Sequence, residues 1–186
     1  FDSTAPLLPE ILALHGKWRG GKDAVVCDAT RWSWEHFCAA NHRFAHGLLS
    51  RGVCPGDRVA ILMSSGLPMV QAIFGTMAAG ACSVPINLSV NDEALAGMLA
   101  DAGAVALIAT DDQAGRVRRL EGSLPDSLQL LVTDGEAAQG WVGLQTLCED
   151  QSEALPAVAT QPDSLLNIIY SSGTTGSPKG ILHTHG

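Results

Sequence analysis

The stretch that decides the fold runs from Ile168 to Gly180 and reads IIYSSGTTGSPKG. A short apolar run leads into a loop of glycines and hydroxyls, and glycines let backbone N–H groups turn toward an anion because positive φ costs them little. The hydroxyl donors come from Ser171, Ser172, Thr174 and Thr175. Lys179 adds the compact positive charge that suits a phosphate. The sequence therefore predicts a polyphosphate-binding loop behind a strand.

Two other interpretations apply to such a loop. The P-loop of ordinary nucleoside triphosphatases has Gly directly before its Lys and Ser or Thr directly after it. Here Lys179 lies between Pro178 and Gly180, so that pattern is absent. A flexible Gly/Ser surface loop has a similar composition. Such a loop would not need Pro and Lys in fixed order behind an apolar strand, so phosphate binding is favoured.

Composition places the chain among ordinary globular proteins. It has 186 residues, of which 46% are hydrophobic and 16% charged, enough for one well-buried domain. The net charge of −8, with only 11 Lys and Arg, argues against a nucleic-acid partner. Three of these arginines, Arg116, Arg118 and Arg119, are interpreted as one solvated helix face.

The cysteines and histidines give no metal pattern. The five cysteines form no C-x-x-C pair, which predicts reduced thiols and a cytoplasmic protein. His36, His42 and His46 lie on an expected helix without an H-E-x-x-H motif, so we expect exposed helix histidines and no metal site. The uncharged run from Val59 to Asn91 is interrupted by prolines and glycines, which predicts buried elements and no transmembrane segment.

The apolar pattern predicts strands that alternate with helices. Continuous apolar strands separated by helices indicate a mostly parallel sheet with helices on both faces, preceded by a small N-terminal hairpin. Expected strands cover 24–28, 31–33, 58–63, 81–85, 105–109, 128–133 and 165–170. Expected helices cover 7–15 (ending near Gly16), 33–51, 68–79, 92–102, 112–120 and 141–148. Residues 149–161 read as a polar connector.

The residues from Ser171 to Gly180 match the phosphate-loop signature of the adenylate-forming superfamily, which includes acyl-CoA synthetases, luciferases and peptide-synthetase adenylation domains. Four upstream segments resemble the same family. They are TRWSW at 30–34, GDRVA at 56–60, MAAGACSVPIN at 77–87 and ADAGA at 100–104. We interpret these four segments as scaffold and assign them no chemistry.

The resemblance implies a partial AMP-binding domain, the N-terminal subdomain of the large domain of an acyl-CoA synthetase. Residues 1–160 would form the α/β subdomain, and 163–186 a strand and the phosphate loop that start the next one. Thr174, Thr175 and Lys179 would contact phosphates, and Ser171 and Ser172 would partly cap the turn. Gly173, Gly176 and Gly180 would allow the backbone conformation that the loop needs. We expect the loop to be mobile and assign no catalytic residue within this chain.

On the same resemblance, the whole enzyme would join a small carboxylic acid to coenzyme A with ATP and Mg²⁺, in fatty acid metabolism, and it could form a homo-oligomer. The family's magnesium-binding glutamate, ribose-binding aspartate, acyl pocket and C-terminal domain would lie beyond Gly186, so we expect this chain alone to be inactive. Two alternatives stay open. One is a peptide-synthetase adenylation domain that serves a carrier protein, and the other is a non-catalytic binding or assembly module.

Overall fold

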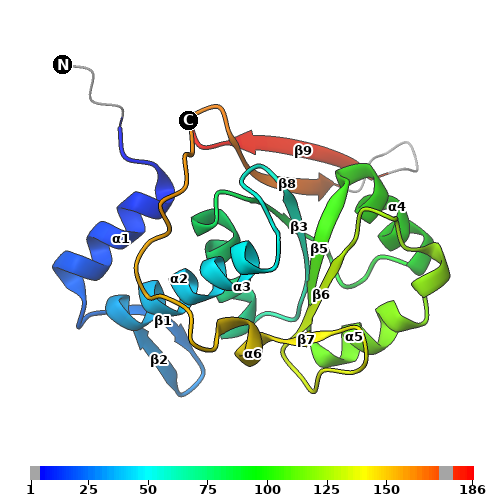
Figure 1. Ribbon diagram of the computed structural model, residues 1–186, viewed down its shortest axis with the longest axis horizontal. Helices are drawn as coiled ribbons and strands as arrows, with labels where there is room; N and C mark the ends of the chain where they lie inside the picture. The colour runs from blue at the N-terminus through cyan, green and yellow to red at the C-terminus, as the bar shows by residue number, and fades with distance from the viewer. Residues whose placement is uncertain (1–4, 172–177) are drawn as a thin grey trace.

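The computed structural model describes residues 5–171 and 178–186 (Figure 1). Its helices are α1 (Leu8–Arg19), α2 (Trp34–Ser50), α3 (Leu67–Ala78), α4 (Asp92–Ala102), α5 (Asp111–Arg118) and α6 (Leu144–Cys148), with a short 3₁₀ turn at Glu121–Ser123. Its strands are β1 (Asp23–Cys27), β2 (Thr30–Ser33), β3 (Arg58–Leu62), β4 (Cys82–Pro85), β5 (Ala104–Ala109), β6 (Leu130–Thr133), β7 (Val142–Gly143), β8 (Leu165–Ser171) and β9 (Lys179–Thr184).

Seven strands form one sheet in the order β7-β6-β5-β3-β4-β8-β9, and β1 and β2 form a separate antiparallel hairpin. All neighbours in the large sheet are parallel except β8 and β9. The predicted fold class, a mostly parallel sheet with a small N-terminal hairpin, is therefore confirmed. The interrupted run 59–91 is β3, α3 and β4, as its prolines and glycines predicted.

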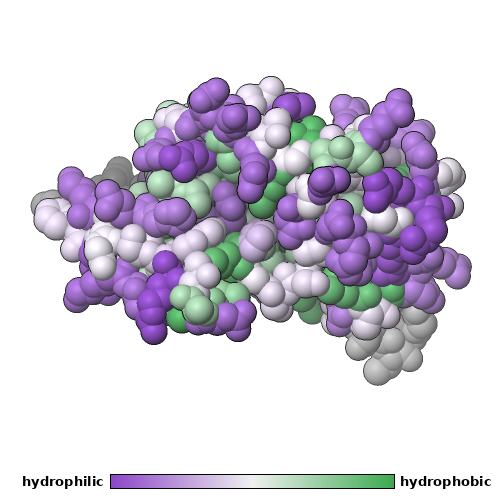
Figure 2. Space-filling model, turned by 90° about the horizontal axis from the view of Figure 1, so that it is seen from below, coloured by the Kyte–Doolittle hydropathy of each residue, from purple (hydrophilic) through white to green (hydrophobic). Residues whose placement is uncertain are grey.

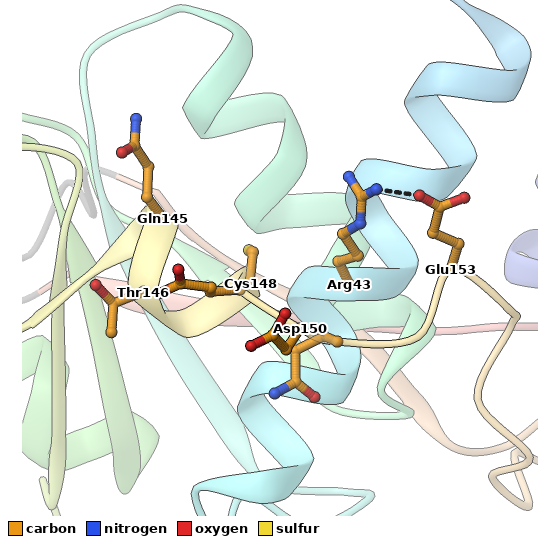
Figure 3. Close-up of a pocket in the computed structure, with 8 residues that line it drawn as sticks. Arg43, Gln145, Thr146, Cys148, Asp150 and Glu153 are labelled. Carbon is orange, nitrogen blue, oxygen red and sulfur yellow. Dashed lines mark hydrogen bonds and ion pairs between the residues drawn. The ribbon is translucent and has the colours of Figure 1, made fainter.

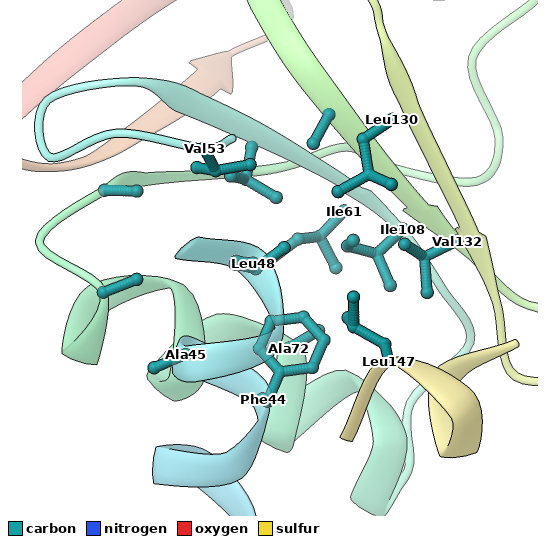
Figure 4. Close-up of a cluster of buried hydrophobic side chains, with 14 of the residues drawn as sticks. Phe44, Ala45, Leu48, Val53, Ile61, Ala72, Ile108, Leu130, Val132 and Leu147 are labelled. Atoms are coloured by element: carbon teal, nitrogen blue, oxygen red, sulfur yellow. The ribbon is translucent and has the colours of Figure 1, made fainter. Parts of the chain in front are cut away.

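Helices cover both faces of the sheet, and each face has its own apolar core. On one face α2, α3 and α6 pack against β3, β5 and β6 around Phe44, Leu48, Ile61 and Leu147 (Figure 4). On the other face α4 and α5 pack through side chains that include Leu95. Burial on both faces explains why the strands read as continuous apolar runs rather than as alternating ones.

Local signals fix several element ends as expected. The Ser33 hydroxyl accepts a hydrogen bond from the His36 amide (3.2 Å) at the start of α2, and the Asn91 side chain accepts one from the Ala94 amide (2.8 Å) at the start of α4. Gly52, after α2, has a φ of +90°, which a side chain would disfavour. These residues satisfy backbone groups at the helix ends and allow the chain to turn there.

The first helix is longer than predicted. We expected α1 to end near Gly16, but it continues to Arg19. A Cβ on Gly16 would lie 2.8 Å from the Sγ of Cys38 on α2. The glycine is there because α1 and α2 pack closely at this point, so a residue that usually ends a helix is retained inside one.

Two expectations near the sheet edges were incomplete. The helix expected at 141–148 begins only at Leu144, because Val142 and Gly143 pair with β6 as the edge strand β7. Strand β9, which follows the phosphate loop, was not predicted at all. Its residues are exposed along its whole length. Its antiparallel pairing with β8 is a tertiary contact, which the sequence of β9 alone does not predict.

The histidine and arginine interpretations need correction at His42 and Arg116, whereas His36, Arg118 and Arg119 are exposed as expected. His42 is buried, and its Nδ1 lies 2.7 Å from the Glu153 carbonyl oxygen, so the 149–161 connector covers it. Arg116 is also not solvated. Its guanidinium donates to the Asp92 carboxylate (2.7 Å) and to the Val90 carbonyl (2.5 Å), which ties α5 to the loop before α4. In both cases a distant segment covers a side chain that periodicity places on an outer face.

The cysteines are all unpaired thiols, as expected. Burial raises the pKa of Cys82 and of Cys148 to about 11, so neither thiol forms a reactive thiolate near neutral pH. The face seen in Figure 2 is mostly hydrophilic, with smaller hydrophobic areas between. Among the described residues, no helix has the length and apolar character that crossing a bilayer demands.

Candidate functional site

The predicted phosphate loop connects the two strands of the β8–β9 hairpin. Ser171 is the last residue of β8, Lys179 is the first residue of β9, and the two lie opposite each other in the antiparallel register. Ser172, Gly173, Thr174, Thr175 and Gly176 lie outside the described residues, as does the segment for which we predicted mobility. The structure therefore positions both ends of the loop.

The hairpin brings these ends to a favourable edge of the sheet. β8 runs parallel to β4, so Ser171 lies at the same edge as the carboxyl ends of the parallel strands. The strand order reverses at β3, which has β4 on one side and β5 on the other. In open α/β sheets, ligands bind outside the carboxyl ends of the strands near such a reversal. This edge is where a phosphate site is expected.

The two faces of the hairpin differ. Cross-strand partners point to the same face and neighbours along a strand alternate, so Ser171 and Lys179 share a face with the paired Ile169 and Ile181. Those two isoleucines are 44% and 49% exposed. The face that carries the loop ends is thus open and partly apolar. No ion pair among the described residues involves Lys179, so its charge is available.

The opposite face of the hairpin is anchored by Tyr170. Its hydroxyl donates to Asp101 Oδ2 on α4 (2.6 Å), and the Met98 carbonyl oxygen lies 3.3 Å away. Burial, together with the hydrogen bond to Asp101, raises the pKa of Tyr170 above its usual range. The phenol therefore stays protonated, and remains a donor, across the physiological pH range. The residue directly before the loop is thereby joined to α4.

Gly180 packs against the same aromatic ring. We expected this glycine to serve a special backbone conformation, but its φ is not positive. A Cβ here would lie 3.0 Å from Ile168 Cγ2 and 3.3 Å from Tyr170 Cζ. The absence of a side chain instead lets β9 lie close to the ring. Tyr170 thus contacts the residues next to both ends of the loop.

A cleft of about 490 Å³ adjoins this anchor. Its lining comes from α4, Tyr170 and Pro178, and includes the carboxylates of Glu93 and Asp101. Two carboxylates would repel a polyphosphate chain, so this cleft is not where we place the phosphates. Those belong on the opposite, open face with Ser171 and Lys179.

A larger surface hollow lies elsewhere. It has a volume of about 660 Å³ and is bounded by α2, α6 and the connector, where Arg43 pairs with Glu153 (Figure 3). Its other charged side chains, Glu149 and Asp150, are acidic. It is remote from the loop, and Arg43, the cation among its lining residues, is already paired with Glu153. The residues that the structure describes do not bring together three His, Cys, Asp or Glu side chains that could hold a metal ion.

The structure places Ser171 and Lys179 at the two ends of the loop, and sequence reasoning missed the residues that support these ends. The sequence analysis interpreted Asp101 only as part of a scaffold turn and Tyr170 only as the end of an apolar run. They are 69 positions apart in the chain and meet because β8 lies beside β4 and α4 covers that face. A single polar aromatic at the end of an apolar strand was the one available signal that a hydrogen-bond partner exists.

Comparison with known proteins gives consistent matches over nearly the whole chain. The family described as "AMP-binding enzyme" matches residues 14–186. Surfactin synthase subunit 2 of Bacillus subtilis is 32% identical over 167 residues, covering 88% of this chain and 4% of that protein. The 3-hydroxybenzoate–CoA/4-hydroxybenzoate–CoA ligase of Thauera aromatica is 29% identical, covering 89% of this chain and 32% of that protein.

Comparison with solved structures also matches this chain to an adenylate-forming enzyme. The anthranilate CoA ligase AuaEII, in complex with anthranoyl-AMP, superposes with a TM-score of 0.90 at 26% identity, over 97% of this chain and 35% of that one. The superposition supports the predicted placement of this chain at the N-terminal part of an adenylate-forming enzyme. The chain spans about a third of the length of the CoA ligases it matches. The predicted boundary at residue 160 stays a prediction.

Proposed function

The chain belongs to the AMP-binding enzyme family, and we propose that it is the N-terminal part of an ATP-dependent carboxylate–CoA ligase. The observation that carries this proposal is the β8–β9 hairpin. It presents Ser171 and Lys179 opposite each other at the carboxyl edge of a parallel sheet, on an open face. The ligand that this arrangement suits is the polyphosphate of ATP.

In the proposed reaction an oxygen of the substrate carboxylate attacks the α-phosphorus of ATP. The bond between that phosphorus and the bridging oxygen breaks, pyrophosphate leaves, and an acyl adenylate remains. The thiol of coenzyme A then attacks the acyl carbon, and AMP departs as a thioester forms. The loop acts in the first step only, because pyrophosphate has gone before the second.

In that first step, residues of this chain position the phosphates of ATP and stabilise the negative charge that develops on them. Lys179 places its ammonium beside the β- and γ-phosphates, where negative charge grows as pyrophosphate leaves. Thr174 and Thr175 donate hydroxyl hydrogen bonds to the same oxygens, and Ser171 and Ser172 shape the turn. Mg²⁺ would supply further charge neutralisation together with ATP.

Coenzyme A is the acceptor we favour over a carrier protein. The supporting feature is the segment Asn87-Leu88-Ser89 after Pro85-Ile86, where adenylation domains of peptide synthetases more often carry an acidic residue and then a Tyr-Pro pair. In the structure the Asn87 side chain accepts from both the amide and the hydroxyl of Ser89, at 2.9 Å each. Relatives of both kinds occur, so the acceptor needs a direct test.

The test is ATP–pyrophosphate exchange by the full-length protein with a panel of aliphatic and aromatic acids, followed by thioester assays with coenzyme A and with a phosphopantetheinylated carrier protein. We expect acid-dependent exchange and transfer to coenzyme A. Transfer to the carrier protein alone would establish the peptide-synthetase alternative. Absence of exchange with every acid, combined with intact nucleotide binding, would favour a non-catalytic module.

The 186-residue chain by itself should give no exchange, because one phosphate-binding element cannot assemble the reaction. Exchange by the pure chain would overturn this part of the proposal. A cytoplasmic location, a role in fatty acid metabolism and a homo-oligomeric state complete the proposal. Cell fractionation tests the location, the preferred acid tests the metabolic role, and sedimentation velocity tests the oligomeric state.

A further inference from the structure

The β8–β9 hairpin is joined to the parallel sheet by little backbone pairing. β3 pairs with β5 at five positions, whereas β8 pairs with β4 only at Ser83 and Asn167. That single pair lies near the start of β8, four residues before the loop begins at Ser171. The end of the hairpin that carries the loop therefore needs another attachment.

Pro85 explains why the ladder stops. The Cys82 amide donates to the Asp57 carbonyl (2.7 Å) and the Ile86 amide to the Ile61 carbonyl (2.9 Å), so alternate residues of β4 hydrogen-bond toward β3. Ser83 and Pro85 are the residues directed toward β8. Proline has no N–H, so the donor that would continue the ladder beyond Ser83 is missing.

The Tyr170 side chain supplies the missing attachment. Its hydroxyl bonds to Asp101 on α4 at 2.6 Å, and Tyr170 lies three residues beyond Asn167, the residue of β8 that pairs with β4. Its ring packs under Gly180, which follows Lys179. One side chain thus connects the last residues of β8, the first residues of β9 and a helix of the buried core. Because Tyr170 and Lys179 alternate faces, the side chain holds the loop ends without occupying the open face.

We propose that Tyr170 and Asp101 form a positioning pair that fixes Ser171 and Lys179, the two ends of the loop, relative to the parallel sheet. This inference rests on the proposed function of the loop. Neither side chain contacts the reacting phosphorus. Their contribution is the position of the groups that do, because misplacement of a charge-stabilising group by even an ångström weakens catalysis.

The inference predicts a specific pattern of losses in the full-length protein. Tyr170→Phe keeps the ring against Gly180 and removes only the hydroxyl. We expect it to raise the KM for ATP and lower kcat in pyrophosphate exchange, with a combined loss of roughly three- to tenfold in kcat/KM, the range for one partly exposed hydrogen bond. Thioester formation from preformed acyl adenylate should stay unchanged, because no pyrophosphate is bound in that step.

Variants at Asp101 separate positioning from general destabilisation. Asp101→Asn keeps an acceptor oxygen for the hydroxyl and should behave nearly as the wild type. Asp101→Ala should lose no more than Tyr170→Phe, because the hydroxyl can still donate to the Met98 carbonyl oxygen 3.3 Å away. The double variant Tyr170→Phe/Asp101→Ala should be no worse than Tyr170→Phe alone, since that change already removes the bond to Asp101. Equal losses in the two half-reactions, or additive losses in the double variant, would overturn the inference.

Amide hydrogen exchange tests the attachment without relying on catalysis. In the full-length protein, Tyr170→Phe should speed exchange at residues 168–171 and 179–182 and leave β3 and β5 unchanged. Unchanged exchange at these hairpin residues would refute the attachment, whatever the activity. If wild-type protein gives no pyrophosphate exchange while hydrogen exchange responds as expected, the proposed function fails and the attachment stands as a purely structural pair.

Discussion

The parallel core and the β8–β9 hairpin are stabilised in different ways. β3 lies between two parallel neighbours and is almost fully buried, whereas β9 is exposed along its whole length and β8 meets β4 at one register pair. The core gains its stability from apolar burial on both faces of the sheet. The hairpin has little burial of its own and depends on a few specific contacts. Binding residues are commonly carried in this way, on a weakly held segment that a rigid scaffold positions.

The largest effect expected from this contrast is on stability. Phe44 is fully buried between α2, α3 and the sheet, so Phe44→Ala should lower the free energy of unfolding by about 3–5 kcal/mol. Ile181→Ala, on the open face of β9, should change it by less than about 0.5 kcal/mol. Urea unfolding of both variants measures the difference. A similar cost at both positions would mean that the hairpin is as much a part of the core as α2.

Charge at the loop gives the next largest effect, on catalysis and not on folding. On the proposed function, Lys179→Ala in the full-length protein would remove a charge-assisted phosphate contact worth about 1.5–3 kcal/mol and slow adenylation roughly ten- to a hundredfold. Thioester formation from synthetic acyl adenylate should be spared. Single-turnover assays of the two half-reactions measure this split, with Lys22→Ala, an exposed lysine near α1, as the matched control. Equal losses in both steps would assign Lys179 to folding or domain motion.

A polar connection within the core region can be probed at Arg116. Its side chain, 14% exposed, holds the loop between β4 and α4 through Asp92 and two backbone carbonyls. Arg116→Met keeps much of the apolar stem and leaves those acceptors unpaired, so we expect a loss of about 1–3 kcal/mol in unfolding free energy. The exposed Arg118 provides the control, and Arg118→Met should be nearly neutral. If the two variants lose the same stability, the contacts of Arg116 contribute nothing specific.

The smallest expected effect is pH dependence on the core side of the molecule. Burial lowers the pKa of His42 below its usual value, so the unfolded chain binds a proton more readily than the folded one. The contribution of His42 is therefore complete above about pH 6.5 and is lost as pH falls below it, with a slope of at most about 1.4 kcal/mol per pH unit.

Urea midpoints between pH 5 and 8 measure this dependence. His42→Asn keeps a donor near the Glu153 carbonyl and should flatten the curve. His46, which lies one turn away and contacts the Ala154 carbonyl, and the Arg43–Glu153 pair face the same connector. His46→Asn therefore serves as the comparison variant. An unchanged curve in His42→Asn would assign the acid sensitivity to other groups.

Much of the architecture could be predicted because the signals are local. Apolar runs bounded by Gly52, Pro55 and Gly56 located β3, and the alternation of strands and helices predicted the parallel sheet. Caps such as Ser33 and Asn91 act within one turn of the helix. The phosphate loop could be located for the same reason, since its hydroxyls, glycines and lysine are contiguous.

What the sequence by itself determined, then, is the identity of most elements and the parallel class of the sheet, together with the place along the chain of the loop that we propose binds phosphate. Only the tertiary structure decided that α1 continues through Gly16, that β9 exists, and that His42 and Arg116 are covered. It alone brought Tyr170 to Asp101. Each of these depends on contacts between residues far apart in the chain. A contact of that kind depends on how the whole sheet and its helices pack. It produces no periodic pattern in the sequence of the segment that makes it.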